Sequence, residues 1–473
     1  MTMGTPASWA EEEFGDAALG DVRRTARLIQ LASVLGAQPQ ASLPQAADAP
    51  ATLKAAYRFF DNPAIRAEAM LASHVAATQR RMQTVPLVLA VQDTTTLDWS
   101  THPATIGLGP IATSSSRHQG LLAHTTLAIT PDRVPLGVLQ QQVWARDTAT
   151  VRQQDHKTRP IAEKESQKWL TSVEAVIAAR AACPDTQFVS VGDREADVYD
   201  LFVQERPEGV DLLVRAAQDR KTDESDGYLW RAMDAAPVVA TVTLTLQARG
   251  EQIAREATVT VSWREVTLRP PTSRAKDRLP TVTVWAVWAI ERTPPAGAKP
   301  VEWLLLTTVP ITTTDEALER LTWYTLRWGI EVWHKVLKSG CRIEKIQLEH
   351  ADRLIRCLTL YSVIAWRIFY ATMVARAVPD APCSVLLDDA EWQGLYCRIH
   401  RVARAPTTPP TLAQAVRWIA RLGGFQGRNG DGDPGVTVMW NGFQRLMEIA
   451  EMYRILHQDA SQSVIDPDLE KRE

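Results

Sequence analysis

The spacing of apolar residues changes along the chain and divides it into regions. Before about residue 75, apolar positions recur at helical intervals in residues 19–35 and 51–60, and Asn62 and Pro63 end the second run. From residue 314 onward helical spacing returns and continues to the polar stretch that begins at about residue 459. The pattern therefore predicts a helical region toward each end of the chain.

Between these ends lie short apolar runs that are typical of buried strands. Residues 85–91 lead to Asp93, and residues 188–192 lead in the same way to Asp193. The pattern also predicts a hairpin over 121–143 and a helix over 161–182. This order of elements indicates the α/β class, with an aspartate at the end of each of two buried strands.

Residues from about 235 to 310 have a period of two instead. Four alternating segments cover 238–246, 257–266, 281–290 and 303–309, and glycine or paired prolines separate them. We expect an all-β insertion over about 235–310.

Composition limits what this fold can do. The 52 basic and 55 acidic residues give a formal net charge of −3, which argues against coating nucleic acid by bulk positive charge. Any polyanion site must therefore be local. Five cysteines without a C-x-x-C pair favour neither a disulfide framework nor a zinc site and fit a reducing cytoplasm. No export signal or 18-residue apolar run is evident, so no membrane role is expected.

The predicted helix over 321–339 carries several polar residues that are candidates for a functional site. Tyr324, Arg327, Glu331 and Lys338 project from one helical face within an arc of about 60°. Such a stripe is often only a salt-bridged surface. Tryptophans at 323, 328 and 333 leave little of this helix free for solvent, however. The stripe is therefore a candidate site.

Asp93, Asp193 and Glu331 together suggest a metal site. Carboxylates held by a rigid sheet and by a helix packed on it suit a hard divalent cation. Two such ions can promote in-line phosphoryl displacement by activating the attacking oxygen and stabilising the leaving oxygen. The order Asp, Asp, Glu, with a β insertion before the glutamate, is an RNase H-like arrangement.

At these residues the chain resembles a known family. Tyr324, Arg327, Glu331 and Lys338 match the YREK signature of the bacterial DDE transposases of the IS-four group, among them Tn-five transposase. The similarity continues in collinear blocks over nearly the whole chain: residues 18–28, 56–63, 93–95, 164–170, 193–197, 303–308 and 419–425. It implies an RNase H-like catalytic domain over 76–375, a transposon-end DNA-binding domain over 1–75 and a dimerisation domain over 376–473.

The resemblance also implies roles for individual residues. Asp93, Asp193 and Glu331 would bind Mg²⁺ or Mn²⁺, two ions in all, and Trp303 would stack on a flipped base. The expected DNA contacts are Tyr324, Arg327, Lys338, Arg215, Arg23, Arg27 and Arg58. Pattern alone favours a core strand residue for Trp303, and it fits a solvated helix face as well as a DNA-binding surface for the N-terminal arginines.

The function implied by the resemblance is cut-and-paste DNA transposition by a cytoplasmic, nucleoid-associated bacterial enzyme. Nicking, hairpin formation, hairpin opening and strand transfer would be the same phosphoryl transfer with different nucleophiles. The expected partners are double-stranded transposon ends, target DNA and a second copy of the chain. Two alternatives stay open: an RNase H-like structure-selective nuclease, and a domesticated protein that binds DNA without cleaving it.

Overall fold

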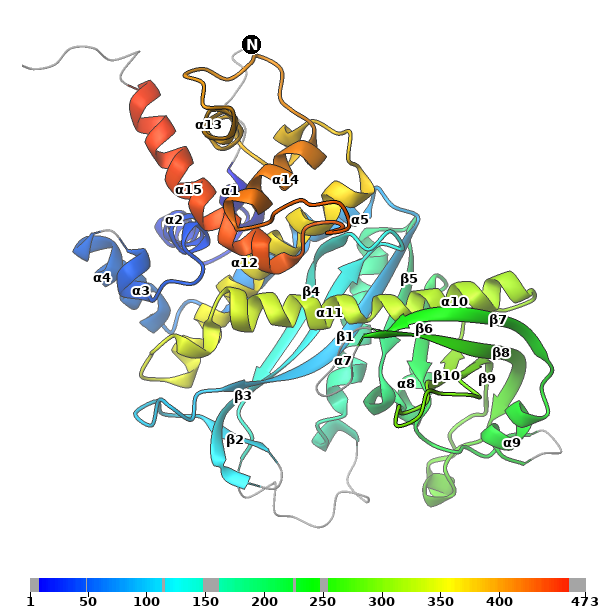
Figure 1. Cartoon of the computed structure of the whole chain (residues 1–473). Coiled ribbons are helices and arrows are strands. Elements are labelled where there is room, and N and C mark those ends of the chain that lie inside the picture. Colours follow the sequence, from blue (N-terminus) through cyan, green and yellow to red (C-terminus); the bar gives the residue numbers. More distant parts are fainter. Residues whose placement is uncertain are drawn as a thin grey trace, which may run out of the picture. The chain divides into compact units, whose positions relative to one another are not determined.

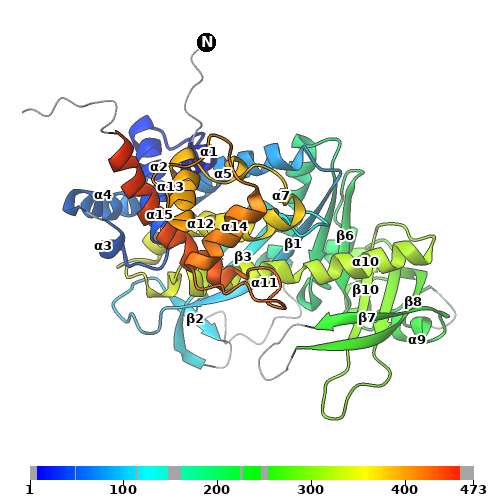
Figure 2. The ribbon, with the colours of Figure 1, turned by 45° about the horizontal axis from the view of Figure 1, so that its top comes forward.

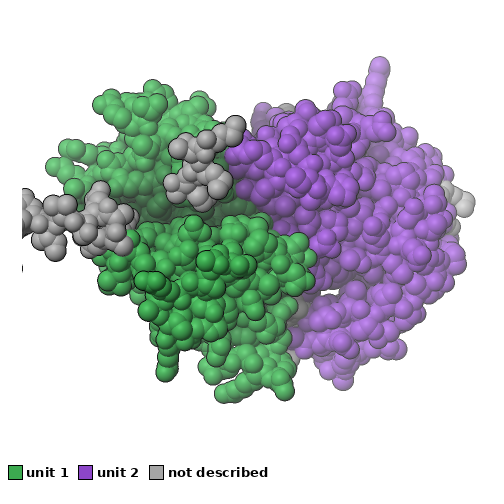
Figure 3. All heavy atoms as spheres, turned by 90° about the horizontal axis from the view of Figure 1, so that it is seen from above, with its two compact units in different colours: residues 1–74, 332–473 green, residues 75–331 purple. Residues whose placement is uncertain are grey.

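The computed structural model describes residues 8–47, 49–112, 115–147, 161–223, 227–246 and 254–458. The polar stretch after residue 458 and the first seven residues of the predicted DNA-binding domain lie outside these ranges. The chain forms two compact units, shown in different colours in Figure 3: residues 1–74 with 332–473 (unit 1), and residues 75–331 (unit 2). The N-terminal helices thus share a unit with the C-terminal helices, whereas the sequence suggested three consecutive domains.

Unit 2 is built on one ten-stranded sheet, in which the order is β2-β3-β1-β5-β6-β10-β9-β8-β7 and β4 pairs with β3 (Figures 1 and 2). The first strands are β1 (Leu87–Asp98), β2 (Gly109–Ala112), β3 (Ser115–Ile129) and β4 (Pro135–Trp144). β3 is antiparallel to β1 and β4, whereas β5 (Gln187–Gly192) is parallel to β1 and to β6 (Val210–Arg215). The predicted hairpin is confirmed as β3 and β4.

The four alternating segments form strands, as predicted, but they do not make a separate sheet. They are β7 (Val238–Leu246), β8 (Arg255–Leu268), β9 (Val282–Ile290) and β10 (Glu302–Thr307). β10 pairs antiparallel with β6 and with β9, so the segment extends the main sheet at its β6 edge. The edge of β6 that does not pair with β5 is thereby covered by β10.

Helices pack on this sheet and complete its core. The predicted helix over 161–182 begins as a short 3-10 turn, η1 (Ile161–Glu163), and continues as α7 (Gln167–Ala182). Trp169 and Val173 of α7 belong to an apolar cluster with strand residues Leu212, Val214 and Leu304. Two short 3-10 turns, η2 (Arg194–Ala196) and η3 (Thr272–Asp277), and helices α8 (Tyr199–Val203) and α9 (Leu229–Asp234) connect the later strands.

The helix predicted over 321–339 is irregular in the structure. It consists of α10 (Thr314–Leu326), α11 (Trp328–Lys335) and a π-helical turn, η4 (Val336–Gly340). Thr313 and Glu316 form a capping box that starts α10, with the Glu316 amide donating to Thr313 Oγ1 over 3.3 Å. Arg327 keeps right-handed helical dihedrals between α10 and α11. Lys338 falls in the π-helical turn, so the regular spacing assumed for it does not hold.

Unit 1 is helical. Its elements from the N-terminal part are α1 (Trp9–Phe14), α2 (Val22–Ala37), α3 (Leu43–Ala46), α4 (Pro50–Asp61) and the first half of α5 (Ala67–Met82). Its C-terminal elements are η5 (Ile343–Lys345), α12 (Ala351–Ala377), η6 (Cys383–Val385), α13 (Asp389–His400), α14 (Leu412–Leu422) and α15 (Val436–Gln458). The N-terminal helices predicted from spacing are confirmed.

A buried arginine joins both ends of the chain within unit 1. Arg367 of α12 lies 3.4 Å from Glu391 of α13, and its guanidinium stands over the rings of Trp9 and Phe443 at 4.8 and 5.4 Å. Both members of this ion pair are almost fully buried. Because a desolvated charge is costly without a partner, the pair and its two rings hold α1 against the C-terminal helices.

Within the described residues, α12 is long and apolar enough to cross a membrane by length and composition. It is, however, 94% buried inside the protein over its most apolar window. Its apolar side chains therefore serve as the core of unit 1.

Candidate active site

Strand register brings the two aspartates to the same place. β1 and β5 pair in parallel from Leu87 opposite Gln187 to Val91 opposite Val191, so Asp93 and Asp193 each come two residues after the last pair, and Asp193 lies near enough to influence the Asp93 carboxyl electrostatically. Adjacent strands lie about 4.8 Å apart. Asp193 follows the end of β5, as expected. Asp93 does not end its strand, because β1 continues to Asp98 by pairing with β3 after the pairing with β5 has stopped.

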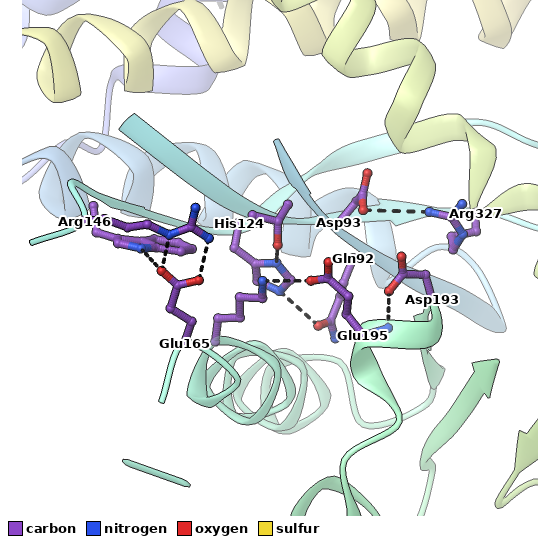
Figure 4. A network of polar contacts seen from close by, with 11 residues as sticks. Gln92, Asp93, His124, Arg146, Glu165, Asp193, Glu195 and Arg327 are labelled. Atoms are coloured by element: carbon purple, nitrogen blue, oxygen red, sulfur yellow. Dashed lines mark hydrogen bonds and ion pairs between the residues drawn. The ribbon is translucent and has the colours of Figure 1, made fainter. Parts of the chain in front are cut away.

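Helix α11 adds a third carboxylate, which is bound by the arginine that precedes the helix. Arg327 Nη2 lies 2.9 Å from Glu331 Oε1, and Arg327 Nη1 lies 3.9 Å from Asp93 Oδ1. The Arg327 side chain is only 7% exposed, and within the described residues its Nε finds no hydrogen-bond partner. Figure 4 shows its guanidinium facing the ends of Asp93 and Asp193.

The carboxylates influence one another electrostatically. Burial raises the pKa of Asp93 to about 6; Arg327 opposes this rise, and the negative charges of Asp193 and Glu331 add to it. Asp193 Oδ1 accepts a hydrogen bond from the Glu195 amide over 2.8 Å, so that it caps η2. The structure thus gathers three acids around one buried arginine.

This acid cluster has the donor chemistry of a magnesium-type site but not its geometry. Carboxylate oxygens are the ligands that Mg²⁺ and Mn²⁺ prefer. Among the described residues, however, no three His, Cys, Asp or Glu side chains are arranged closely enough to hold a metal ion. Arg327 neutralises Asp93 and Glu331 instead. The Glu331 side chain is 35% exposed, which leaves it room to adopt another rotamer.

Tyr324 lies beside the acid cluster in a basic surrounding. Burial raises the pKa of its hydroxyl, while Arg327 and Arg215 oppose the rise and Arg215 hydrogen-bonds the side chain. Arg215, the last residue of β6, also donates from Nη2 to the Glu302 carbonyl over 2.8 Å. Two arginines and a tyrosine hydroxyl therefore lie close together near Asp193, and they form a donor set suited to phosphate.

Trp303 packs against this tyrosine rather than facing solvent. It is 8% exposed on β10, and its ring meets Tyr324 and Trp328 edge to face at centroid distances of 5.3 and 6.3 Å. In this structure Trp303 is a core residue next to the acid cluster. Stacking on a base would require the indole to leave these two contacts.

Two segments of the sequence match known protein families. Residues 6–65 match the model described as Transposase DNA-binding, and residues 363–461 match the Transposase Tn5 dimerisation domain. The chain therefore carries transposase domains. These matches support a DNA transposase that binds DNA and forms a dimer. Among solved structures, the chain is similar to a piggyBac transposase synaptic complex with hairpin DNA, with a TM-score of 0.34 and 10% identity over 77% of this chain and 72% of that chain.

The remaining predicted DNA contacts lie in unit 1. Arg23 pairs with Asp21 over 2.8 Å, Arg27 donates to Gln30 over 2.7 Å, and Arg58 is exposed on α4. All three lie within the segment that matches the transposase DNA-binding model. Lys338 also belongs to unit 1, where its Nζ lies 3.5 Å from Glu344 Oε1. Its role toward the acid cluster stays a prediction.

Sequence patterns alone did not single out the residues that lie behind Asp93 on the other face of the sheet. His124 of β3 is fully buried and contacts Thr94 and Gln92, the neighbours of Asp93 (Figure 4). Lys168 of α7 lies 3.2 Å from Glu195. A histidine within an apolar and threonine-rich strand is the sequence signal for His124. Its position next to the neighbours of Asp93 follows only from the pairing of β3 with β1.

Proposed function

We propose that the protein is a DDE transposase that moves DNA by cut-and-paste, with Asp93, Asp193 and Glu331 as its metal ligands. The observation that carries this proposal is the convergence of these acids around Arg327, in a chain that has transposase domains. The strand order β4-β3-β1-β5-β6, with two antiparallel pairs followed by two parallel pairs, supports an RNase H-like core.

The fit to a divalent cation depends on a change of partners. Phosphate oxygens of bound DNA would compete for Arg327 and release Glu331 toward Asp93 and Asp193. Bound Mg²⁺ or Mn²⁺, two ions in all, would activate an attacking oxygen and stabilise the leaving one. Because the pKa of Asp93 is raised to about 6 in the absence of a cation, its deprotonated form predominates only above about pH 6.

The other polar side chains would position the DNA. Arg327, Tyr324 and Arg215 would bind phosphates beside Asp193, and Lys338 would add a further phosphate contact. Trp303 would receive a base unstacked by hairpin formation, where stacking contributes about 1–3 kcal/mol. Nicking, hairpin formation, hairpin opening and strand transfer would then use one set of residues with successive nucleophiles.

The partners follow from the matched segments. The helices α2 and α4, with Arg23, Arg27 and Arg58, would read the transposon end. The C-terminal helices would pair two copies so that two ends are held together, and the reaction would take place on nucleoid DNA in the bacterial cytoplasm. Target DNA would be the acceptor of the final strand transfer.

A plasmid test distinguishes this proposal from its rivals. The full chain would be incubated with Mg²⁺ and a plasmid that carries the terminal sequences flanking its reading frame. Excision through hairpin-ended intermediates is expected. Nicking without hairpins would instead identify a structure-selective nuclease, and binding of the ends without any cleavage would identify a DNA-binding protein that has lost catalysis.

A further inference from the structure

A polar layer lies beneath Asp93 on the opposite face of the sheet. Successive side chains of a strand point to opposite faces, so Gln92 and Thr94 lie on the face away from Asp93. His124 is the partner of Thr94 in the β1–β3 register and shares its face. Its Nδ1 lies 2.9 Å from Thr94 Oγ1, and its Nε2 lies 3.4 Å from Gln92 Oε1. One imidazole therefore bridges both neighbours of Asp93.

The same layer reaches β5, the strand that ends just before Asp193. Gln92 Nε2 donates to Ser190 Oγ on β5 over 2.5 Å, so a polar chain crosses β3, β1 and β5. A neutral imidazole protonated on Nε2 satisfies this chain, because Nδ1 then accepts from the Thr94 hydroxyl and Nε2 donates to Gln92. His124 and Gln92 are both buried, where a lost partner is costly.

Trp169 of α7 packs against the His124 end of this polar layer. Its indole meets the His124 ring edge to face at 4.6 Å. It also closes over Gly192, the residue before Asp193: a Cβ at that position would lie 3.4 Å from the indole and 2.4 Å from the Ala196 Cβ. The second distance leaves no room for a methyl group, so glycine permits the tight turn at which β5 delivers Asp193. The Trp169 indole therefore lies against His124, which contacts the neighbours of Asp93, and against Gly192, which precedes Asp193.

From these contacts we propose that His124 is a positioning residue, which fixes Asp93 relative to Asp193 for cation binding. This inference rests on the proposed metal role of the two aspartates. His124 lies on the face of the sheet opposite to Asp93. It acts through Thr94 and Gln92, which set the backbone on each side of Asp93, and Trp169 holds the imidazole in place. Changes to groups that orient metal ligands typically reduce metal affinity 10- to 100-fold.

The test measures Mn²⁺ binding by the full-length protein, from the loss of the free-ion electron paramagnetic resonance signal. His124→Leu removes the polar contacts of the imidazole with Thr94 and Gln92, and Thr94→Val removes the first of these with almost no change of shape. Thr186→Val is the matched control, because Thr186 Oγ1 donates to the Met82 and Val85 carbonyls beyond the opposite end of β5. Unfolding temperatures identify variants that lose comparable stability.

We expect His124→Leu and Thr94→Val to raise the half-saturating Mn²⁺ concentration by about 10-fold or more. The Thr186→Val control should stay within about twofold of the parent at a similar loss of unfolding temperature. If the His124 and Thr94 variants bind Mn²⁺ as the control does, His124 is only a core residue and the inference is overturned. If the parent protein itself binds no Mn²⁺, the metal role of the aspartates is overturned first. Thr94→Val decides the matter alone should His124→Leu fail to fold.

Discussion

Replacement of Asp93 by asparagine should stabilise the metal-free protein, and only above mildly acidic pH. Burial and the neighbouring acids raise the folded-state pKa of Asp93 to about 6 from its usual 3.8. A carboxyl group with a raised folded pKa is neutral and without penalty at low pH, and it destabilises the fold as pH rises through this window. The difference corresponds to about 3 kcal/mol at neutral pH, at about 1.4 kcal/mol per pKa unit.

The assay is thermal unfolding of the parent and of Asp93→Asn in EDTA at about pH 3 and about pH 7.5, which bracket the two pKa values. The variant should match the parent at the lower pH and unfold at a higher temperature at the upper pH. Addition of Mn²⁺ at the upper pH should stabilise the parent and not the variant, since a cation that binds only the folded state raises its stability. The gain in stability would come with loss of cleavage.

Asp98 provides a control of opposite sign on the same strand. Burial acts to raise its pKa, but hydrogen bonds from Ser100 and the contact with His118 outweigh this effect and hold the pKa below its usual value. Asp98→Asn should therefore cost stability at neutral pH and little at low pH. A constant difference between Asp93→Asn and the parent at both pH values would refute the view that Asp93 is destabilised by burial and like charge.

Three further outcomes are expected. Glu331→Gln should abolish DNA cleavage and leave end binding, measured by gel shift, within about twofold, because it removes an acid and no phosphate donor; the matched control Glu319→Gln on α10 should cleave normally. Trp303→Ala should slow hairpin formation more than first-strand nicking in a gel-based time course, and equal slowing would leave Trp303 as the core residue that packs on Tyr324. Leu456→Glu should reduce dimer formation in sedimentation experiments, since Leu456 is 66% exposed on α15 within the matched dimerisation segment, and an unchanged dimer would place the interface elsewhere.

Much of the fold was predictable because local patterns decide it. Unbroken apolar runs identified β1 and β5, and period-two alternation identified the four strands of the presumed insertion. The pattern could not show that those strands join the main sheet, because alternation fixes which face is buried and not which edge is paired. It also ended β1 too early, since residues after Val91 pair with β3 alone and no longer read as a fully buried strand.

The division of the chain into two units was harder to predict from the sequence than the strands were. Residues after 331 continue the helix that carries Glu331, so sequence continuity assigned them to the catalytic domain. The structure instead places them with the N-terminal helices, where Arg356 of α12 donates to the Phe60 and Ile65 carbonyls over 3.0 and 2.7 Å. Contacts between residues almost 300 positions apart are set by tertiary packing, and no helical period encodes them.

The candidate site shows the same limit at the level of side chains. Strand register makes the approach of Asp93 and Asp193 predictable, and helical spacing makes Arg327 and Glu331 neighbours four residues apart. Neither rule predicts which carboxylates Arg327 will contact. Without a cation, the three half-buried acids can lie near one another because Arg327 offsets part of their negative charge. The part of the electrostatic cost that Arg327 does not offset raises the pKa of Asp93. A group of acids kept together despite this cost is typical of a functional site, because an apolar core would have been more stable there.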